Sequence, residues 1–137
     1  MPAAHEYFEH GADIGVVGGG ASVEEAFAAA AASMFAIMVE PDGVRPLLQV
    51  EVDFDEDDLE LALVRWLNAL LARARERGLV LCAFELRRDG SHWSGLARGE
   101  PWRDAHVRGT EVKGATLTAL SVRQAPQGWQ ARCVVDV

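Results

Sequence analysis

The sequence predicts an α+β fold, arranged as a two-layer single domain in which two helices pack on a mostly antiparallel sheet. Apolar residues recur at helical spacing in two segments, and in several others they alternate with polar residues between turn-forming residues. The chain has 137 residues, a length that suits one domain with one hydrophobic core. We therefore assign residues 1–137 to a single domain.

The two helical segments also carry the usual signals for helix ends. At the first, Ser22 and Glu25 have the spacing of a capping box, which satisfies free backbone N–H groups. At the second, acidic residues precede the apolar stripe and Gly78 follows it, as the helix dipole and a glycine stop predict. We predict helices over residues 23–39 and 59–77.

The remaining apolar segments have the alternation of strands, in which successive side chains point to opposite faces. Gly, Pro and Asp residues between them mark turns. The expected strands cover residues 6–9, 14–17, 48–54, 79–87, 92–97, 111–124 and 129–137, with turns at 10–13, 89–90 and 126–128 and a polar loop at 98–110.

Two short motifs are similar to ligand-binding loops but lack residues or spacings that such loops require. Gly18-Gly19-Gly20 lacks the spacing of either phosphate-binding glycine motif, so we interpret it as a flexible connector. The acidic run 53–58 opens like a calcium loop, but Asp58 stands where glycine is needed and Val64 where a bidentate acid is needed. We interpret this run as the start of the second helix.

The formal net charge of −8 restricts the partners of the protein. Nucleic-acid-binding proteins usually present a basic stripe, whereas the clearest basic cluster here closes a helix. We expect no strong direct nucleic-acid binding, and a cation or a basic protein as partner. Because no segment is long and apolar enough to span a bilayer and the start lacks the pattern of a secretory signal, we expect a cytoplasmic protein. The oligomeric state stays open.

The chain ends on two adjacent negative charges, the side chain of Asp136 and the α-carboxylate of Val137, directly after an apolar run. Burying a carboxylate without a partner costs several kcal/mol, and a bound cation would remove that cost. Asp13, in a turn near the start, could supply a third carboxylate. Such hard oxygen ligands suit calcium or magnesium. The alternative is that Asp13 caps its own turn and that the chain end is solvated.

Sequence motifs give no support for catalysis by the protein itself. His10 could act as a base, but no nucleophile motif accompanies it, and the histidines lack the spacing of a zinc site. Glu111 and Lys113 share one face of the expected strand, either as a surface ion pair or as a functional polar patch. A metal-dependent phosphohydrolase and a general chaperone-like binding module remain alternative functions.

The order and spacing of six segments resemble the archease family over nearly the whole chain. The segments are His10–Gly15, Ser22–Phe27, Leu63–Asn68, Ala97–Trp102, Gly109–Lys113 and Val135–Val137.

This resemblance implies a non-enzymatic accessory protein that activates an RtcB-type RNA ligase in tRNA splicing and RNA repair. It would promote guanylylation of the ligase and so allow multiple turnovers. The resemblance also implies an archease-like fold and a divalent-metal site, with calcium as the expected ion, formed by Asp13, Asp136 and Val137. The residues expected to act on the ligase are His10, Glu100, Glu111 and Lys113.

Overall fold

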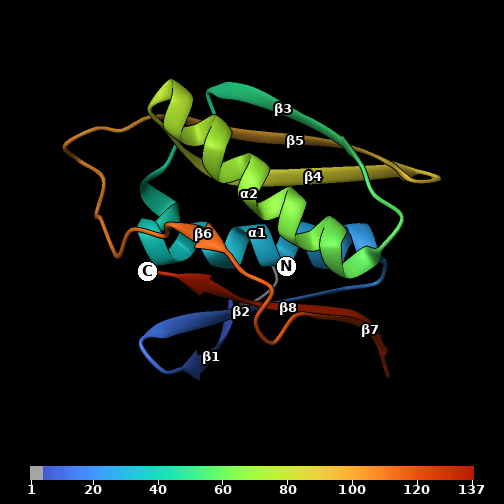
Figure 1. Ribbon diagram of the computed structural model, residues 1–137. Helices are drawn as coiled ribbons and strands as arrows, with labels where there is room; N and C mark the ends of the chain where they lie inside the picture. Colours follow the sequence, from blue (N-terminus) through green and yellow to red (C-terminus); the bar gives the residue numbers. More distant parts are fainter. Residues whose placement is uncertain (1–4) are drawn as a thin grey trace.

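The computed structural model describes residues 5–137, and within this range the chain forms eight strands and two α-helices, with one short 3-10 helix. The first four residues of the expected domain lie outside the described residues, and with them most of the segment considered as a secretory signal. The α+β fold, with two helices packed on antiparallel sheet, is confirmed. The strands divide into two sheets, which adds a layer to the two expected (Figure 1). No helix in the described range is both long and apolar enough to cross a membrane.

The first sheet joins the two ends of the chain. Its strand β2 pairs antiparallel with both its sequence neighbour β1 and the last strand, β8. The far edge of β8 pairs with two short strands, β6 near its end and β7 near its start. The five strands are β1 (Glu6–His10), β2 (Asp13–Gly20), β6 (Gly114–Ala115), β7 (Ser121–Ala125) and β8 (Gly128–Asp136).

The long strand expected at residues 111–124 is wrong, because only β6 and β7 form there. Between them the chain loops out, with Ala119 in the left-handed region at a φ of 50°. The Thr116 hydroxyl donates to the Val134 carbonyl at 2.8 Å and accepts from the Thr118 N–H at 3.2 Å. The Thr116 side chain thus takes part in local bonds that compete with a continuous strand, which a pattern of alternating residues does not reveal.

The second sheet has the order β3-β5-β4, and both of its pairings are antiparallel. Strand β5 begins at His92 as expected, but it ends at Pro101 and so extends four residues into the segment predicted as the loop 98–110. The hairpin turn lies one residue later than expected, at Gly90 and Ser91, with Gly90 at a φ of 62°. The strands are β3 (Leu48–Asp55), β4 (Leu79–Asp89) and β5 (His92–Pro101).

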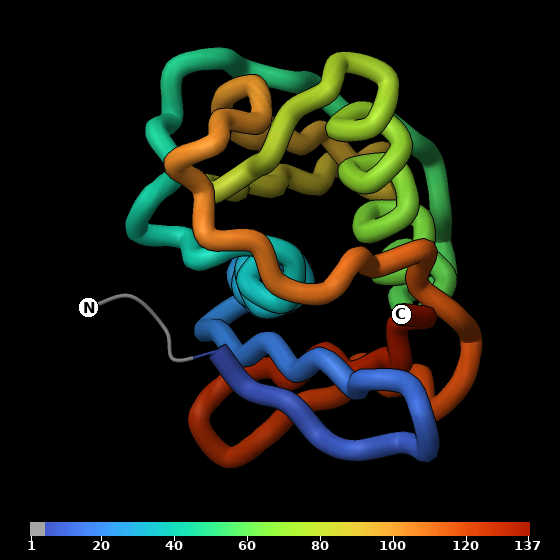
Figure 2. The backbone as a smooth tube through the Cα atoms, turned by 90° about the vertical axis from the view of Figure 1, so that its left-hand side faces the viewer, coloured from blue at the N-terminus to red at the C-terminus, as the bar shows by residue number. Residues whose placement is uncertain are grey.

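Helix α1 (Val23–Met38) lies between the two sheets, packed on β2 and β8 on one side and on β4 on the other (Figures 1 and 2). The predicted cap is present, since Ser22 Oγ accepts from the Glu25 N–H at 3.1 Å. The interpretation of Gly18–Gly20 as a flexible connector is wrong, because these glycines belong to β2. A Cβ atom at Gly18 would overlap the Ala26 carbonyl and the Ala30 nitrogen. The glycines therefore let the helix backbone approach the sheet closely.

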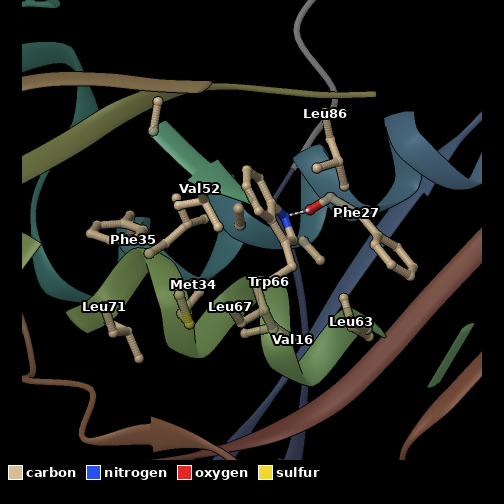
Figure 3. Packing of buried hydrophobic residues seen from close by; sticks show 14 of the residues in the cluster. Val16, Phe27, Met34, Phe35, Val52, Leu63, Trp66, Leu67, Leu71 and Leu86 are labelled. Carbon is tan, nitrogen blue, oxygen red and sulfur yellow. Dashed lines mark hydrogen bonds between the residues drawn. The ribbon is translucent and has the colours of Figure 1, made fainter. Parts of the chain in front are cut away.

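Helix α2 (Leu59–Arg77) contacts β3 and β4 of the second sheet and also β6 and β7 of the first. Asp58 caps its start by accepting from the Leu61 N–H at 3.0 Å, as expected for the acidic run, and Gly78 ends it in the left-handed conformation. Trp66 is fully buried and donates through Nε1 to the Phe27 carbonyl of α1 at 3.0 Å (Figure 3). Its ring occupies the space that a side chain at Gly95 would need. This contact joins α1, α2 and the second sheet in one core.

Replacing Gly18 tests the close approach of α1 to β2. We expect Gly18→Ala to lower the free energy of unfolding by about 1–3 kcal/mol, because the added methyl group meets backbone atoms that move only with the whole helix. Urea denaturation measures the change. Gly43→Ala, in the 3-10 helix (Pro41–Gly43), is the control: nothing lies within 4 Å of its Cβ position. Equal stability of both variants would refute the packing argument.

Candidate functional site

The β1–β2 hairpin places Asp13 at the start of β2. His10 and Asp13 face each other across a two-residue turn in which Gly11 has a φ of 60°, a conformation that favours glycine. Directly opposed residues in an antiparallel pair share one face of the sheet, so His10 and Asp13 lie on the same face. The histidine is exposed and the aspartate is half-buried.

The chain end meets Asp13. The ladder between β2 and β8 runs to Ile14 opposite Val135, and Asp13 and Asp136 are the next residues of the two strands beyond that pair. The backbone N–H of Val137 donates to Asp13 Oδ1 at 3.3 Å, across 124 positions of sequence. In both Figure 1 and Figure 2 the chain end and the turn of the β1–β2 hairpin lie on the same side of the molecule. The structure therefore places two of the expected metal ligands, Asp13 and Val137, in contact, and Asp136 is the residue next to Val137.

The donors at this place are all oxygen atoms, and no basic side chain balances them. Within residues 5–137 neither Asp13 nor Asp136 takes part in a salt bridge. Like charges opposite each other on a sheet repel, and a cation would relieve that repulsion. In the same range no group of three or more His, Cys, Asp or Glu side chains is placed to hold a metal ion. A site here therefore needs the terminal carboxylate as its third ligand. The donor set fits a hard divalent cation such as calcium.

Lys113 lies beside the chain end. Its backbone N–H donates to the Asp136 carbonyl at 2.8 Å, and its side chain is exposed. The expected strand face shared with Glu111 is wrong, because β6 begins only at Gly114. Glu111 is exposed as well and lines a pocket next to this segment. Two of the expected partner-facing residues thus remain accessible on one short segment.

Two polar side chains of α2 fix the position of this segment, and the sequence analysis gave neither of them a role. Asn68 accepts from the Ala115 N–H at 2.8 Å and donates to its carbonyl at 3.2 Å, as a neighbouring strand would. Arg75 donates to the carbonyls of Val112 and Lys113, the second at 2.9 Å. A polar side chain on the inner side of an otherwise amphipathic helix is the only sequence signal of such a role.

Glu100 differs from the other expected partner-facing residues because it is only 1% exposed. Arg45 donates to its carboxylate from the backbone at 2.8 Å and from Nε at 2.9 Å. Arg103 donates to both carboxylate oxygens, at 2.9 and 3.0 Å. His106 Nε2 lies 2.9 Å from Oε2, while its Nδ1 accepts from the Arg103 N–H. The carboxylate is therefore enclosed by its own chain and does not face a partner.

These contacts make Glu100 an anchor for the loop that follows β5. The hydrogen bonds from Arg103, and then those from Arg45 and His106, hold the pKa of the Glu100 carboxyl well below its usual range, although burial opposes them. A lowered pKa in the folded state means that the ionised form stabilises the fold. That stability is present above the unfolded-state pKa, about 4.3, and is lost as the pH falls below it.

Replacing Glu100 by the neutral isostere tests this anchor. We expect Glu100→Gln to melt at a lower temperature than the unmodified protein at pH 7, because the two arginines lose a buried anionic partner. Between pH 5 and 2 the melting temperature of the variant should fall less, since it has no carboxylate to protonate at this position. Thermal denaturation followed by circular dichroism measures both. Parallel pH curves for the two proteins would contradict the assignment.

Comparison with known proteins assigns the chain to a family. Residues 5–137 match the family model described as the Archease protein family. "Protein archease" of Methanosarcina mazei is 35% identical over 139 residues, covering 97% of this chain and 95% of the relative. "Protein archease" of Thermococcus kodakarensis is 36% identical over 138 residues, covering 96% of this chain and 97% of the relative.

Solved structures with a similar fold support the same family assignment. The solution structure of a protein from Methanobacterium thermoautotrophicum has a TM-score of 0.78 and 26% identity, and the match covers 97% of this chain and 98% of that one. The crystal structure of an archease from Thermotoga maritima, titled a possible chaperone, has a TM-score of 0.65 and 20% identity, covering 98% of both chains, and shows the shared fold. With its fold, its chain-end geometry and a family match over residues 5–137, this protein belongs to the archease family.

Proposed function

We propose that this protein is a cytoplasmic accessory factor that activates an RtcB-type RNA ligase in tRNA splicing and RNA repair. It promotes guanylylation of the ligase and so allows multiple turnovers. In this proposal it performs no catalysis by itself and acts with a bound divalent cation, foremost calcium. The observation that carries the proposal is the meeting of Asp13 with the chain end, where Val137 N–H donates to Asp13 Oδ1.

The residues at and near the chain end have different roles in this proposal. Asp13, Asp136 and the terminal carboxylate of Val137 hold the cation, which neutralises their charge and ties the hairpin to the last strand. Lys113, attached through its backbone to the Asp136 carbonyl, presents a positive charge beside them. His10, opposite Asp13, and Glu111 complete the surface offered to the ligase. Glu100 acts indirectly, by anchoring the loop that leads to Glu111.

The charge of the protein supports a partner of opposite sign. A net charge of −8 favours encounter with a basic protein, such as one that binds RNA, and charge complementarity acts mainly on the rate of association. We therefore expect the stimulation to weaken as the salt concentration rises, because salt screens surface charges over about 10 Å at 0.1 M.

A chaperone-like binding module is the second candidate, because a structural relative from Thermotoga maritima is titled a possible chaperone. It predicts suppression of aggregation of an unrelated protein without dependence on a metal ion. A metal-dependent phosphohydrolase, the third candidate, predicts hydrolysis of a phosphate ester by the protein alone.

Substitution of Asp136 tests the activating role. We expect Asp136→Asn to abolish multiple-turnover ligation by a cognate ligase, while single-turnover ligation by pre-guanylylated ligase continues. The fold should survive because the side chain is exposed and only its backbone pairs with β6. Asp89→Asn, at the end of β4 and also exposed, is the matched control and should stimulate fully. Full stimulation by Asp136→Asn would refute the proposal.

Calcium titration tests the metal site without a ligase. At a calcium concentration of 100 times the dissociation constant, binding to the folded state adds about 2.7 kcal/mol of stability, or roughly 10 °C in melting temperature. We expect this shift in the unmodified protein and its loss in Asp13→Asn and Asp136→Asn. Differential scanning calorimetry, with magnesium in a parallel series, measures it. An equal calcium-induced shift in melting temperature in the unmodified protein and both variants would show that calcium does not bind at the chain end.

A further inference from the structure

A pocket of about 380 Å³ lies where the C-terminal ends of α1 and α2 meet the segment between β5 and β6. Its floor is apolar and comes from both helices and the start of β4, including the buried side chains of Phe35, Leu71 and Leu79. Its size falls within the usual range for small-molecule sites, roughly 300–1,000 Å³. Of the residues that line it, the proposed activation of a ligase uses only Glu111.

The charged side chains that line the pocket have a net charge opposite in sign to that of the whole protein. Arg75, Arg108 and Glu111 line it, so its charged side chains sum to a single positive charge in a chain whose net charge is −8. Within residues 5–137 neither arginine forms a salt bridge, and Arg75 bonds only to neutral carbonyls there. Two guanidinium groups without a carboxylate partner favour an anion, above all a phosphate.

One wall of the pocket is aromatic and held in place. Trp102 lies against the guanidinium of Arg108, whose Cζ is 4.0 Å from the ring centroid, and its ring meets His106 edge to face at 5.6 Å. His106 is in turn bonded to the buried Glu100. The Arg108 guanidinium is therefore held in place before any ligand arrives, which lowers the cost of binding a phosphate.

We propose that this pocket binds a nucleoside phosphate. The apolar floor accepts the base, Arg75 and Arg108 bind the phosphate, with Arg108 held in place by the Trp102 ring, and Glu111 accepts a hydrogen bond from an N–H group of the base. The inference concerns binding by the protein alone and is independent of the proposed ligase. Because Arg75 also holds the carbonyls of Val112 and Lys113, an occupied pocket would be linked to the position of Lys113 beside the chain end.

Isothermal titration calorimetry with GMP, AMP and inorganic phosphate tests the proposal on the full chain. We expect at least one nucleotide to bind with a dissociation constant below about 1 mM and at least about tenfold more tightly than phosphate. Arg108→Gln and Trp102→Leu should each weaken nucleotide binding about tenfold or more. Arg123→Gln, an exposed arginine on β7, is the matched control and should bind as the unmodified protein does.

Three results would overturn the proposal. They are no binding of either nucleotide, binding of phosphate as tight as that of both nucleotides, and binding that survives in both pocket variants. Thermal melting of each variant without ligand shows whether it is folded. If Trp102→Leu fails to fold, Arg108→Gln decides the outcome alone, because its side chain is exposed and its loss leaves no buried group unpaired.

Discussion

Strand β2 pairs with β8 from Gly20 opposite Trp129 to Ile14 opposite Val135, and this ladder joins the two ends of the chain in the first sheet. Asp13 and Asp136 are the next residues beyond the last pair, so the register of this ladder brings both to the same end of the sheet. A slip of one residue would turn Asp136 to the other face and separate the two carboxylates. The candidate metal centre therefore depends on the packing of α1 across Gly18, which holds β2 in place.

A second set of contacts relates the helices to the functional surface. Helix α2 holds β6 through Asn68 and the segment before β6 through Arg75, and that segment in turn bonds to the chain end through Lys113. Glu100 anchors the preceding loop from the other side through Arg103 and His106. Exposed groups on a connecting segment gain a defined position in this way, because buried polar contacts hold the backbone that carries them.

The outline of the fold and part of the site could be predicted from the sequence. Both helices were predicted within one residue at their ends, because Ser22, Gly78 and the apolar stripes are local signals. The segment after Lys113 was mispredicted because the Thr116 hydroxyl bonds to the Val134 carbonyl and to the Thr118 N–H, backbone groups that the alternating pattern assigns to a strand. The Gly18–Gly20 segment was misjudged because a glycine that makes room for a helix looks the same in sequence as one in a flexible connector.

By itself the sequence determined which residue types were available, namely an acidic chain end, an acidic turn and a net negative charge. It could not determine which acids face solvent. Tertiary structure decided that Asp13 reaches Val137 and that Glu100 is enclosed by Arg45, Arg103 and His106. The physical reason is that both outcomes depend on contacts between segments far apart in the chain, and these form only when strand register and helix packing are set together.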